Sequence, residues 1–261
     1  MKLDKESYIA HIEDREQIIN MRQVLDKVEI VLKNHSIQHT DFLDPYERRL
    51  ARSILNGFTE ISYRELGGVS QAERKIISIY PSYYYHDDIG IPITALKVKG
   101  ISSKLSHRDF LGSILGLGIN RDKIGDILIH ENYAQIIVKS EISSFILISL
   151  KKVGNVNVST EEIRLEDLRL GKIDYKEIFA IISSLRLDTL VSGAWHLSRN
   201  DSKKLIESGK TKLNWEPIEK VSKDIEEGDL ISAKGYGRFI LDSIEGTTRK
   251  GNIKVKLRLL K

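Results

Sequence analysis

The side chains with the clearest capacity for chemistry are cations that gather between positions 186 and 212. They lie on or beside two expected helices and the following turn, and they are Arg186, Arg199, Lys203, Lys204, Lys210 and Lys212. A short helical pair with a cationic face can lie against a phosphate backbone, and an Arg fork matches phosphate oxygens better than Lys does. A solvated face is the plain alternative for any single Lys. The pattern predicts a nucleic-acid contact.

Net charge supports this prediction, because the positive excess lies in the C-terminal third. Residues 181–261 hold 16 Lys and Arg against 11 Asp and Glu, whereas residues 1–180 hold 25 against 26. Such asymmetry is expected of a nucleic-acid module attached to neutral domains.

Two short helices must position these cations. Apolar residues recur at helical spacing over 184–195, which predicts the first helix. Ser198 is the candidate N-cap of the second helix, with Asn200 and Asp201 as rivals, and Gly209 ends it. We expect Arg186 and Arg199 to meet phosphate at the two helix starts, where free backbone N–H groups also favour anions.

Strands are expected around the helices. The run 178–182 predicts a buried strand before them, and the alternation over 210–215 predicts a half-buried strand after them. Gly228-Asp229 is a turn before a strand that begins at Leu230, and residues 244–260 predict a hairpin that turns at 247–251.

The N-terminal region, from residue 4 to about 80, is predicted to be helical. Apolar stripes at helical spacing run through its first thirty residues. Asp44, Pro45 and Glu47 have the pattern of a capping box with proline at the first helical position. Residues 70–79 are expected to form a further helix that Pro81 ends.

Over residues 83–163 the spacing of the apolar residues changes, and strand-like segments alternate with helical ones. Strands are expected near 93–98, 125–129, 134–138 and 153–158, with a helix opened by Ser106 and another over 141–150. This strand-helix-strand-strand-helix-strand order is the ferredoxin-like arrangement that RNA-recognition motifs share. Tyr133 is the one aromatic residue of the third strand, so an aromatic platform for bases is not expected. The run 83–86, Tyr-Tyr-Tyr-His, is assigned to interdomain packing rather than to stacking on RNA.

We therefore predict an α+β fold. We expect a helical region at 1–80, a ferredoxin-like domain resembling RNA-recognition motifs at 81–165, and an RNA-binding domain at 177–261, with a charged connector over 164–176.

Composition limits the number of domains and excludes several classes of protein and of site. The 261 residues are 41% hydrophobic and 30% charged, which suffices for about two domains with real cores. A run of eighteen apolar residues is absent, the N-terminus is charged, and the chain has no cysteine. We therefore expect a cytoplasmic protein without a membrane span, disulfides or thiolate chemistry. The seven histidines show no ligand spacing, so neither a metal nor a cofactor is expected.

Three other motifs suggest catalysis and are judged weaker. Arg186-Leu187-Asp188-Thr189 is similar to the catalytic loop of pseudouridine synthases, in which the aspartate is the nucleophile, but only about 70 residues follow it. Asp188 is instead expected to orient Arg186 or to cap helical N–H groups. The run 107–109, His-Arg-Asp, fits a capping box better than acid-base chemistry, and the glycines at 112, 116 and 118 lack the spacing of a dinucleotide loop.

The order and spacing of the pieces from 184 to 239 resemble the small RNA-binding module called S-four-type, or alpha-L. The whole chain resembles the YlmH family of bacterial RNA-binding proteins. The pieces that carry this resemblance are Phe42-Leu43-Asp44-Pro45-Tyr46-Glu47, Ala72-Glu73-Arg74, His107-Arg108-Asp109-Phe110-Leu111-Gly112, Gly125-Asp126-Ile127, Ser184-Leu185-Arg186-Leu187-Asp188 and Gly235-Tyr236-Gly237-Arg238-Phe239. One departure is Trp215 after Asn214, where the module often has glycine.

The resemblance implies a non-catalytic protein that binds RNA, ribosomal RNA first and tRNA second, on the large ribosomal subunit, in the rescue of stalled subunits. Two other interpretations stay open: an RNA-modifying enzyme that uses Asp188, and a division-associated interaction protein. The residues expected to contact RNA are Arg186, Arg199, Asp201, Lys203, Lys204, Lys210, Lys212, Asn214, Lys220 and Arg238. No small-molecule substrate or membrane partner is expected.

Overall fold

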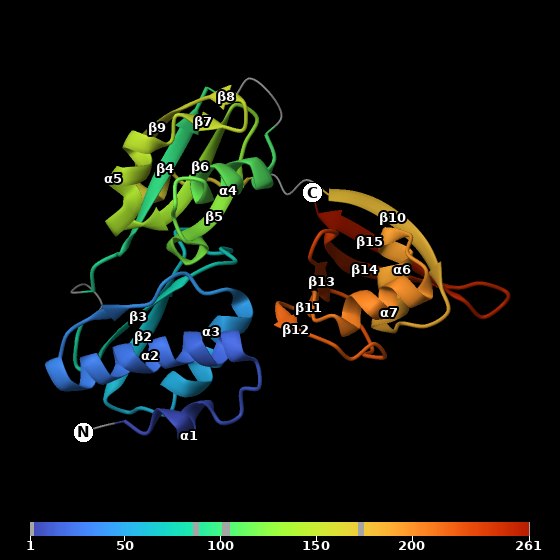
Figure 1. Cartoon of the computed structure of the whole chain (residues 1–261), viewed down its shortest axis with the longest axis horizontal. Coiled ribbons are helices and arrows are strands. Elements are labelled where there is room, and N and C mark those ends of the chain that lie inside the picture. Colours follow the sequence, from blue (N-terminus) through green and yellow to red (C-terminus); the bar gives the residue numbers. More distant parts are fainter. Residues whose placement is uncertain (1–2, 86–88, 101–104, 172–174, 261) are drawn as a thin grey trace. The chain divides into compact units, whose positions relative to one another are not determined.

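The structure is a computed structural model, and it describes residues 3–85, 89–100, 105–171 and 175–260 (Figure 1). Its contacts divide the chain into two units, Met1–Lys172 and Ile173–Lys261. Both combine helices with antiparallel sheets, which agrees with the expected α+β class. No helix in the described ranges is long and apolar enough to cross a membrane.

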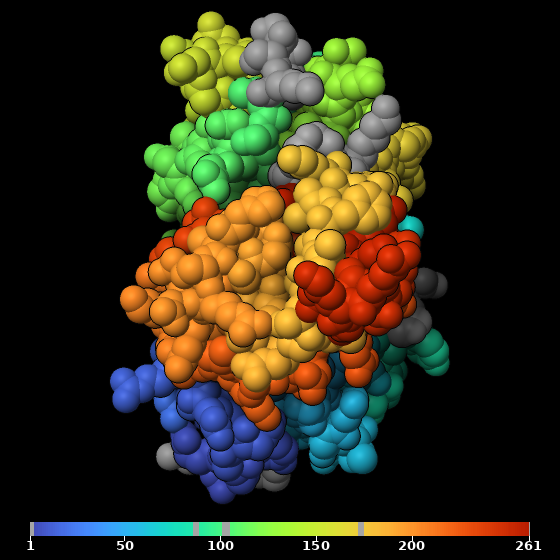
Figure 2. Space-filling model, turned by 90° about the vertical axis from the view of Figure 1, so that its right-hand side faces the viewer, coloured from blue at the N-terminus to red at the C-terminus, as the bar shows by residue number. Residues whose placement is uncertain are grey.

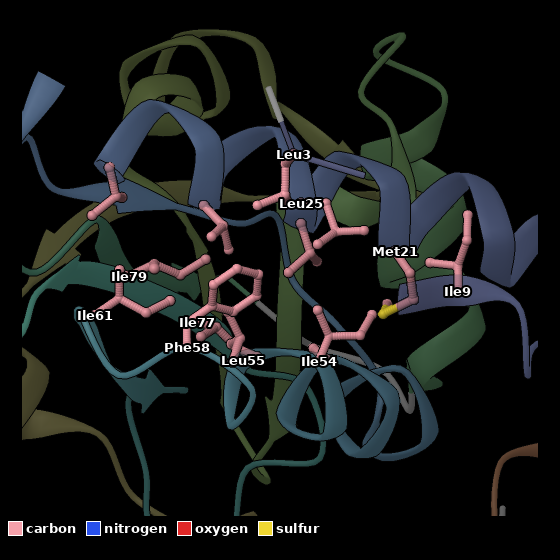
Figure 3. Packing of buried hydrophobic residues seen from close by; sticks show 14 of the residues in the cluster. Leu3, Ile9, Met21, Leu25, Ile54, Leu55, Phe58, Ile61, Ile77 and Ile79 are labelled. Atoms are coloured by element: carbon pink, nitrogen blue, oxygen red, sulfur yellow. The ribbon is translucent and has the colours of Figure 1, made fainter. Parts of the chain in front are cut away.

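The first part of the N-terminal unit packs three helices against a small sheet. The helices are α1 (Lys5–Ile9), α2 (Arg15–Asn34) and α3 (Pro45–Leu55), and the strands, in the sheet order β1-β3-β2, are β1 (Gln38–His39), β3 (Ile76–Pro81) and β2 (Ile61–Leu66). Figure 3 shows Met21 and Leu25 of α2 above Ile54 of α3 and Ile77 of β3 in the shared core. The expected capping box is confirmed, since Asp44 accepts the backbone N–H groups of residues 46 and 47.

The prediction of an all-helical region is wrong for residues 61–81. The expected helix over 70–79 is a turn followed by β3, whose six residues are all buried. Strand β3 pairs with β1 on one side and with β2 on the other. A short apolar run that is buried on both faces has no alternation, so its period cannot distinguish a strand from a buried helix.

The second part of the N-terminal unit is a four-stranded antiparallel sheet with two helices on one face. Its elements are β4 (Ile93–Lys99), α4 (His107–Leu115), the 3₁₀ turn η2 (Arg121–Lys123), β5 (Ile124–Ile129), β6 (Tyr133–Lys139), α5 (Ser140–Ser149) and β9 (Ser159–Ile163). The strand order is β5-β6-β4-β9. A second 3₁₀ turn, η3 (Leu165–Asp167), follows β9.

The last expected strand of this sheet was misplaced. Residues 153–158 contribute instead to a two-stranded hairpin of β7 (Lys152–Val153) and β8 (Val156–Asn157), and the fourth strand of the sheet is β9. Gly154 has φ +55°, a conformation that glycine adopts readily, so it provides the turn between β7 and β8.

A shared interface joins the two parts of the N-terminal unit. Phe42 and Ile76 pack with Ala95 and Ile137 in one buried cluster. The expected boundary between residues 80 and 81 therefore lies inside one compact unit.

Hydrogen bonds reinforce this interface. The Asp126 carboxylate accepts the backbone N–H groups of Glu73 at 2.7 Å and Arg74 at 3.0 Å, and the Arg74 guanidinium donates to the carbonyls of Phe42 and Ile124. Burial raises the pKa of Asp126 above its ordinary value, although the two N–H groups oppose that change.

The C-terminal unit is a six-stranded antiparallel sheet with two helices on one face. The elements are β10 (Tyr175–Ile182), α6 (Leu187–Trp195), α7 (Arg199–Glu207), β11 (Thr211–Leu213), β12 (Glu216–Pro217), β13 (Leu230–Ala233), β14 (Gly237–Thr247) and β15 (Ile253–Leu260). The strand order is β10-β15-β14-β13-β11-β12. Its core holds Leu190 and Ile206 of the helices against Phe239 and Leu257 of the sheet.

Two sequence expectations about this unit need correction. Strand β10 was expected to be buried, but it is an edge strand that leaves Phe179 73% and Ile181 65% exposed. The strand after α7 ends at Leu213 rather than at residue 215, because Asn214 (φ 48°) and Trp215 (φ 72°) form a turn. This turn adopts left-handed backbone angles without glycine.

Candidate nucleic-acid interface

Helices α6 and α7 form an exposed surface of the C-terminal unit (orange in Figure 2). Arg186 is the N-cap residue of α6, and its guanidinium donates two hydrogen bonds to the Asp188 carboxylate, at 3.0 and 3.2 Å. The Arg186 side chain is 43% exposed, whereas that of Asp188 is only 14% exposed. Asp188 thus orients Arg186, one of the two roles expected of it, and leaves part of the guanidinium open to solvent.

The start of α6 does not offer its backbone N–H groups to an anion. The N–H of Leu187 donates to the carbonyl of Lys223 at 2.8 Å, and that of Asp188 donates to the carbonyl of Val221 at 3.3 Å. The expected contribution of this helix start to phosphate binding is therefore wrong, because a loop distant in sequence occupies its donors.

The same loop brings a cation that sequence reasoning missed. Lys223 is exposed, and its backbone lies directly against the start of α6, beside Arg186. Lys220 is exposed three residues earlier. Residues 218–225 have no periodicity that could have placed Lys223 there, since its position depends on hydrogen bonds across the chain.

Helix α7 begins as expected. Ser198 is its N-cap and accepts the backbone N–H of Asp201 at 3.1 Å, while the Ser198 hydroxyl donates to the Asp201 carboxylate at 2.7 Å. The exposed Arg199 guanidinium donates to the Ser183 hydroxyl at 2.7 Å. This bond ties the start of α7 to the segment just before Arg186, so it holds Arg199 toward the same region. Asp201 belongs to the cap of the helix.

Most lysines of this surface have no acidic group at ion-pair distance among the described residues. Lys203 lies 3.7 Å from Glu207 one turn along α7. Lys204, Lys210 and Lys220 are exposed, and within the described ranges no acidic group lies at ion-pair distance from them. We call the cations around the helices, namely Arg186, Arg199, Lys203, Lys204, Lys220 and Lys223, the helical face.

Three of the expected contact residues that lie apart from the helical face belong to the sheet or to its turns. Asn214 donates to the Asp229 carboxylate at 2.7 Å and accepts the backbone N–H of Leu230 at 2.9 Å, so it holds a turn. Lys212 and Arg238 lie on β11 and β14, on the side of the sheet away from the helices, because their strand neighbours face the core. Arg238 lies over the Trp215 ring at 5.6 Å.

Lys210 follows Gly209, which has φ +68° and ends α7 as expected. It therefore lies at the far end of α7 from Arg199. Five of the ten expected residues thus belong to the helical face, and Asp201 belongs to the cap of α7. Lys210 follows α7, Asn214 holds a turn, and Lys212 and Arg238 lie on the opposite side of the sheet.

The sheet of β4, β5, β6 and β9 has little open surface for bases. Ala95 and Ile137 are buried against the N-terminal part of the unit, and Gln135 is bonded to the backbone of residues 167 and 169. Tyr133 stacks on His130, with ring centroids 4.4 Å apart, and Lys97 lies 4.3 Å from its ring. This arrangement agrees with the expectation that an aromatic platform is missing.

The other motifs have structural roles. Ser106 and Asp109 form the expected capping box of α4, and the hydrogen bond from the Ser106 hydroxyl holds the pKa of Asp109 below its ordinary value. Tyr83 and Tyr84 bond to His35 at the end of α2, whereas residue 86 lies outside the described residues. In the described ranges no group of acidic and histidine side chains could hold a metal ion.

Comparisons with known proteins extend over nearly the whole chain. Residues 14–84 match a family model described as "YlmH, N-terminal", and residues 86–167 match one described as "Putative RNA-binding domain in YlmH". The chain is 34% identical over 235 residues to "Ribosome-associated protein quality control protein P2" of Bacillus subtilis, covering 89% of this chain and 91% of that protein. A solved structure, "Cell division protein ylmH from Streptococcus pneumoniae", shares its fold with a TM-score of 0.53, 24% identity, and coverage of 60% of this chain and 97% of that one.

Proposed function

Because this chain belongs to the YlmH family, we propose that it is a non-catalytic RNA-binding protein that acts on the large ribosomal subunit in quality control of stalled ribosomes. Ribosomal RNA is its first partner in this proposal, and tRNA held on that subunit is its second. The name of the Bacillus subtilis relative states a role in ribosome-associated protein quality control, which supports the ribosome as the proposed partner. The proposed site of action is the cytoplasm, where ribosomes work.

The observation that carries the proposal is the helical face. Arg199 is exposed and the Arg186 side chain is 43% exposed, and each guanidinium has N–H groups that Ser183 or Asp188 does not occupy. Lys204, Lys220 and Lys223 surround them as exposed point charges. Arg binds phosphate through an oriented fork and Lys through charge alone, so this combination suits a folded RNA backbone.

We further propose that residues 177–261 are an S-four-type domain and residues 81–165 a ferredoxin-like domain. The pair of short helices with a Ser198 cap supports the first assignment. The strand order β9-β4-β6-β5, with α4 and α5 packed on one face, supports the second.

We infer no catalytic role for Asp188. Both oxygens of its carboxylate accept bonds from Arg186, and the side chain is mostly buried. A nucleophile must reach its substrate, and this carboxylate instead positions a neighbouring cation.

The test is crosslinking in living cells followed by sequencing of the RNA bound to the wild-type protein and to Arg186→Ala/Arg199→Ala. We expect reads from ribosomal RNA of the large subunit that fall sharply in the variant. Reads spread evenly over messenger RNA, or an unchanged profile in the variant, would contradict the proposal. Affinity for purified subunits should also fall steeply with rising salt, because bound cations displace condensed counterions.

A further inference from the structure

The sheet of the C-terminal unit has a second face that α6 and α7 do not cover. The helices pack on the side that Ile182, Leu257 and Phe239 line. Alternation along β10 and β15 places a different set of side chains on the other side, in rows set by the register of the two strands. We call this set the outer face, and it comprises Tyr175, Glu177, Phe179 and Ile181 of β10 and Lys254, Lys256, Arg258 and Leu260 of β15.

Large apolar side chains of β10 project from the outer face into solvent. Phe179 is 73% exposed, Ile181 65% and Tyr175 42%. Single exposed apolar residues are common on proteins, but Phe179 and Ile181 are adjacent on this side of one edge strand, and Tyr175 lies in the same row beyond Glu177. Such a patch indicates a binding surface.

Cations stand in register with these apolar side chains. Lys256 is paired with Phe179 across the strands, and Lys254 with Ile181. The Arg258 guanidinium lies 5.6 Å from the Tyr175 ring. Lys254 is exposed, and the described residues give it no ion pair.

Two carboxylates form ion pairs with Lys256 and Arg258. Glu177 lies 2.8 Å from Lys256, and Asp242 lies 2.8 Å from Arg258. Along the row from Leu260, the register continues to Arg238 on β14 and to Lys212 on β11. Even without those two residues, the three cations Lys254, Lys256 and Arg258 of the outer face outnumber Glu177 and Asp242.

We infer that the outer face binds single-stranded RNA, with bases stacked on Phe179 and Tyr175 and phosphates held by Lys254. Flat aromatic rings between cations suit unpaired nucleotides, since every base has a face that can stack and every linkage has a negative charge. A duplex keeps its base faces inside, so it could not use the rings. An acidic protein would use the cations but would have no need of aromatic rings in particular.

This inference rests on the proposed function only in that the same unit binds RNA. The outer face and the helical face lie on opposite sides of one sheet. Substitutions can therefore abolish binding at one face without altering the other. Together they would let one domain bind a folded RNA with its helices and an unpaired segment with its sheet.

The experiment measures binding of the full chain to a short fluorescein-labelled oligouridylate by fluorescence anisotropy. Phe179→Leu keeps an apolar side chain but removes the ring, and we expect it to weaken binding about fivefold or more. Phe179→Tyr keeps the ring and should bind like wild type. Phe145→Leu alters a 49% exposed phenylalanine of α5 and is the matched control, expected to have no effect.

Three results would overturn the inference. The wild type could fail to bind the oligouridylate, Phe179→Leu could bind as tightly as wild type, or wild type alone could self-associate in sedimentation equilibrium through Phe179. The last result would make the outer face a contact between copies. Arg199→Ala should keep its oligouridylate affinity while losing ribosomal subunits, so failure of the outer face and failure of the proposed function give different patterns.

Discussion

Replacing Asp188 by Asn separates the two roles that this residue could have. In the structure both oxygens of its carboxylate accept a hydrogen bond from Arg186. Asn keeps the shape and one acceptor oxygen but removes the charge. We therefore expect Asp188→Asn to fold, to bind RNA somewhat less tightly, and to leave every modified base of ribosomal RNA in place.

The size of each effect follows from the geometry. Arg186 is 43% exposed, so loss of the ion pair should cost about 0.2–1 kcal/mol of folding stability. Binding should weaken by about 0.5–1.5 kcal/mol, since the Arg186 side chain must then be ordered on binding. Arg186→Ala removes the charged contact itself and should cost about 1.5–3 kcal/mol of binding.

The assays are urea unfolding, cosedimentation with large ribosomal subunits, and mass spectrometry of ribosomal RNA from cells that carry only the variant. Asp167→Asn is the matched control, because the Asp167 carboxylate also accepts two hydrogen bonds from an arginine, Arg164, in the other unit. A missing pseudouridine in the Asp188→Asn strain would refute our reasoning and favour the enzyme. Equal binding losses for Asp188→Asn and Arg186→Ala would show that Asp188 does more than orient its neighbour.

Three further predictions concern stability. Asn214→Ala should lower the free energy of unfolding in urea by about 1–3 kcal/mol and leave RNA affinity nearly unchanged, because the N–H of Leu230 loses its acceptor. Asp126→Ala should lower the free energy of unfolding by about 2–6 kcal/mol, since the partly buried N–H groups of Glu73 and Arg74 lose their acceptor. A loss no larger than that of a surface substitution would contradict this prediction. Burial, with repulsion from Lys139, holds the pKa of His39 below 6.5, so thermal melts should show wild type losing stability as the pH falls below that value and His39→Gln losing less.

Local signals were sufficient for much of the C-terminal unit. The Ser198 cap and Gly209 after α7 were predictable because each depends on residues within one helical turn. The capping box at Asp44 was predictable for the same reason, since it depends only on residues 44–47. Because the helix boundaries were predictable, Arg186 and Arg199 could be identified as candidates for RNA contact.

Features that depend on the rest of the fold could not be predicted in this way. The apolar run of β3 and that of β10 have similar composition, yet one is central and the other is an edge strand. Whether a strand is central or at an edge depends on which strands pair with it, and the sequence of the strand alone does not show this. Lys223 and the occupied N–H groups of α6 were missed for the same reason, because both depend on a loop that returns to the helix.

The central claim, that the helical face binds the ribosome, is tested most directly by cosedimentation of Arg199→Ala with purified large subunits. Arg249→Ala is the matched control, since it removes an exposed guanidinium from the turn between β14 and β15. We expect Arg199→Ala to weaken binding about tenfold or more while its circular dichroism is unchanged, and Arg249→Ala to bind like wild type. A folded Arg199→Ala protein that cosediments as well as the wild type would contradict the claim.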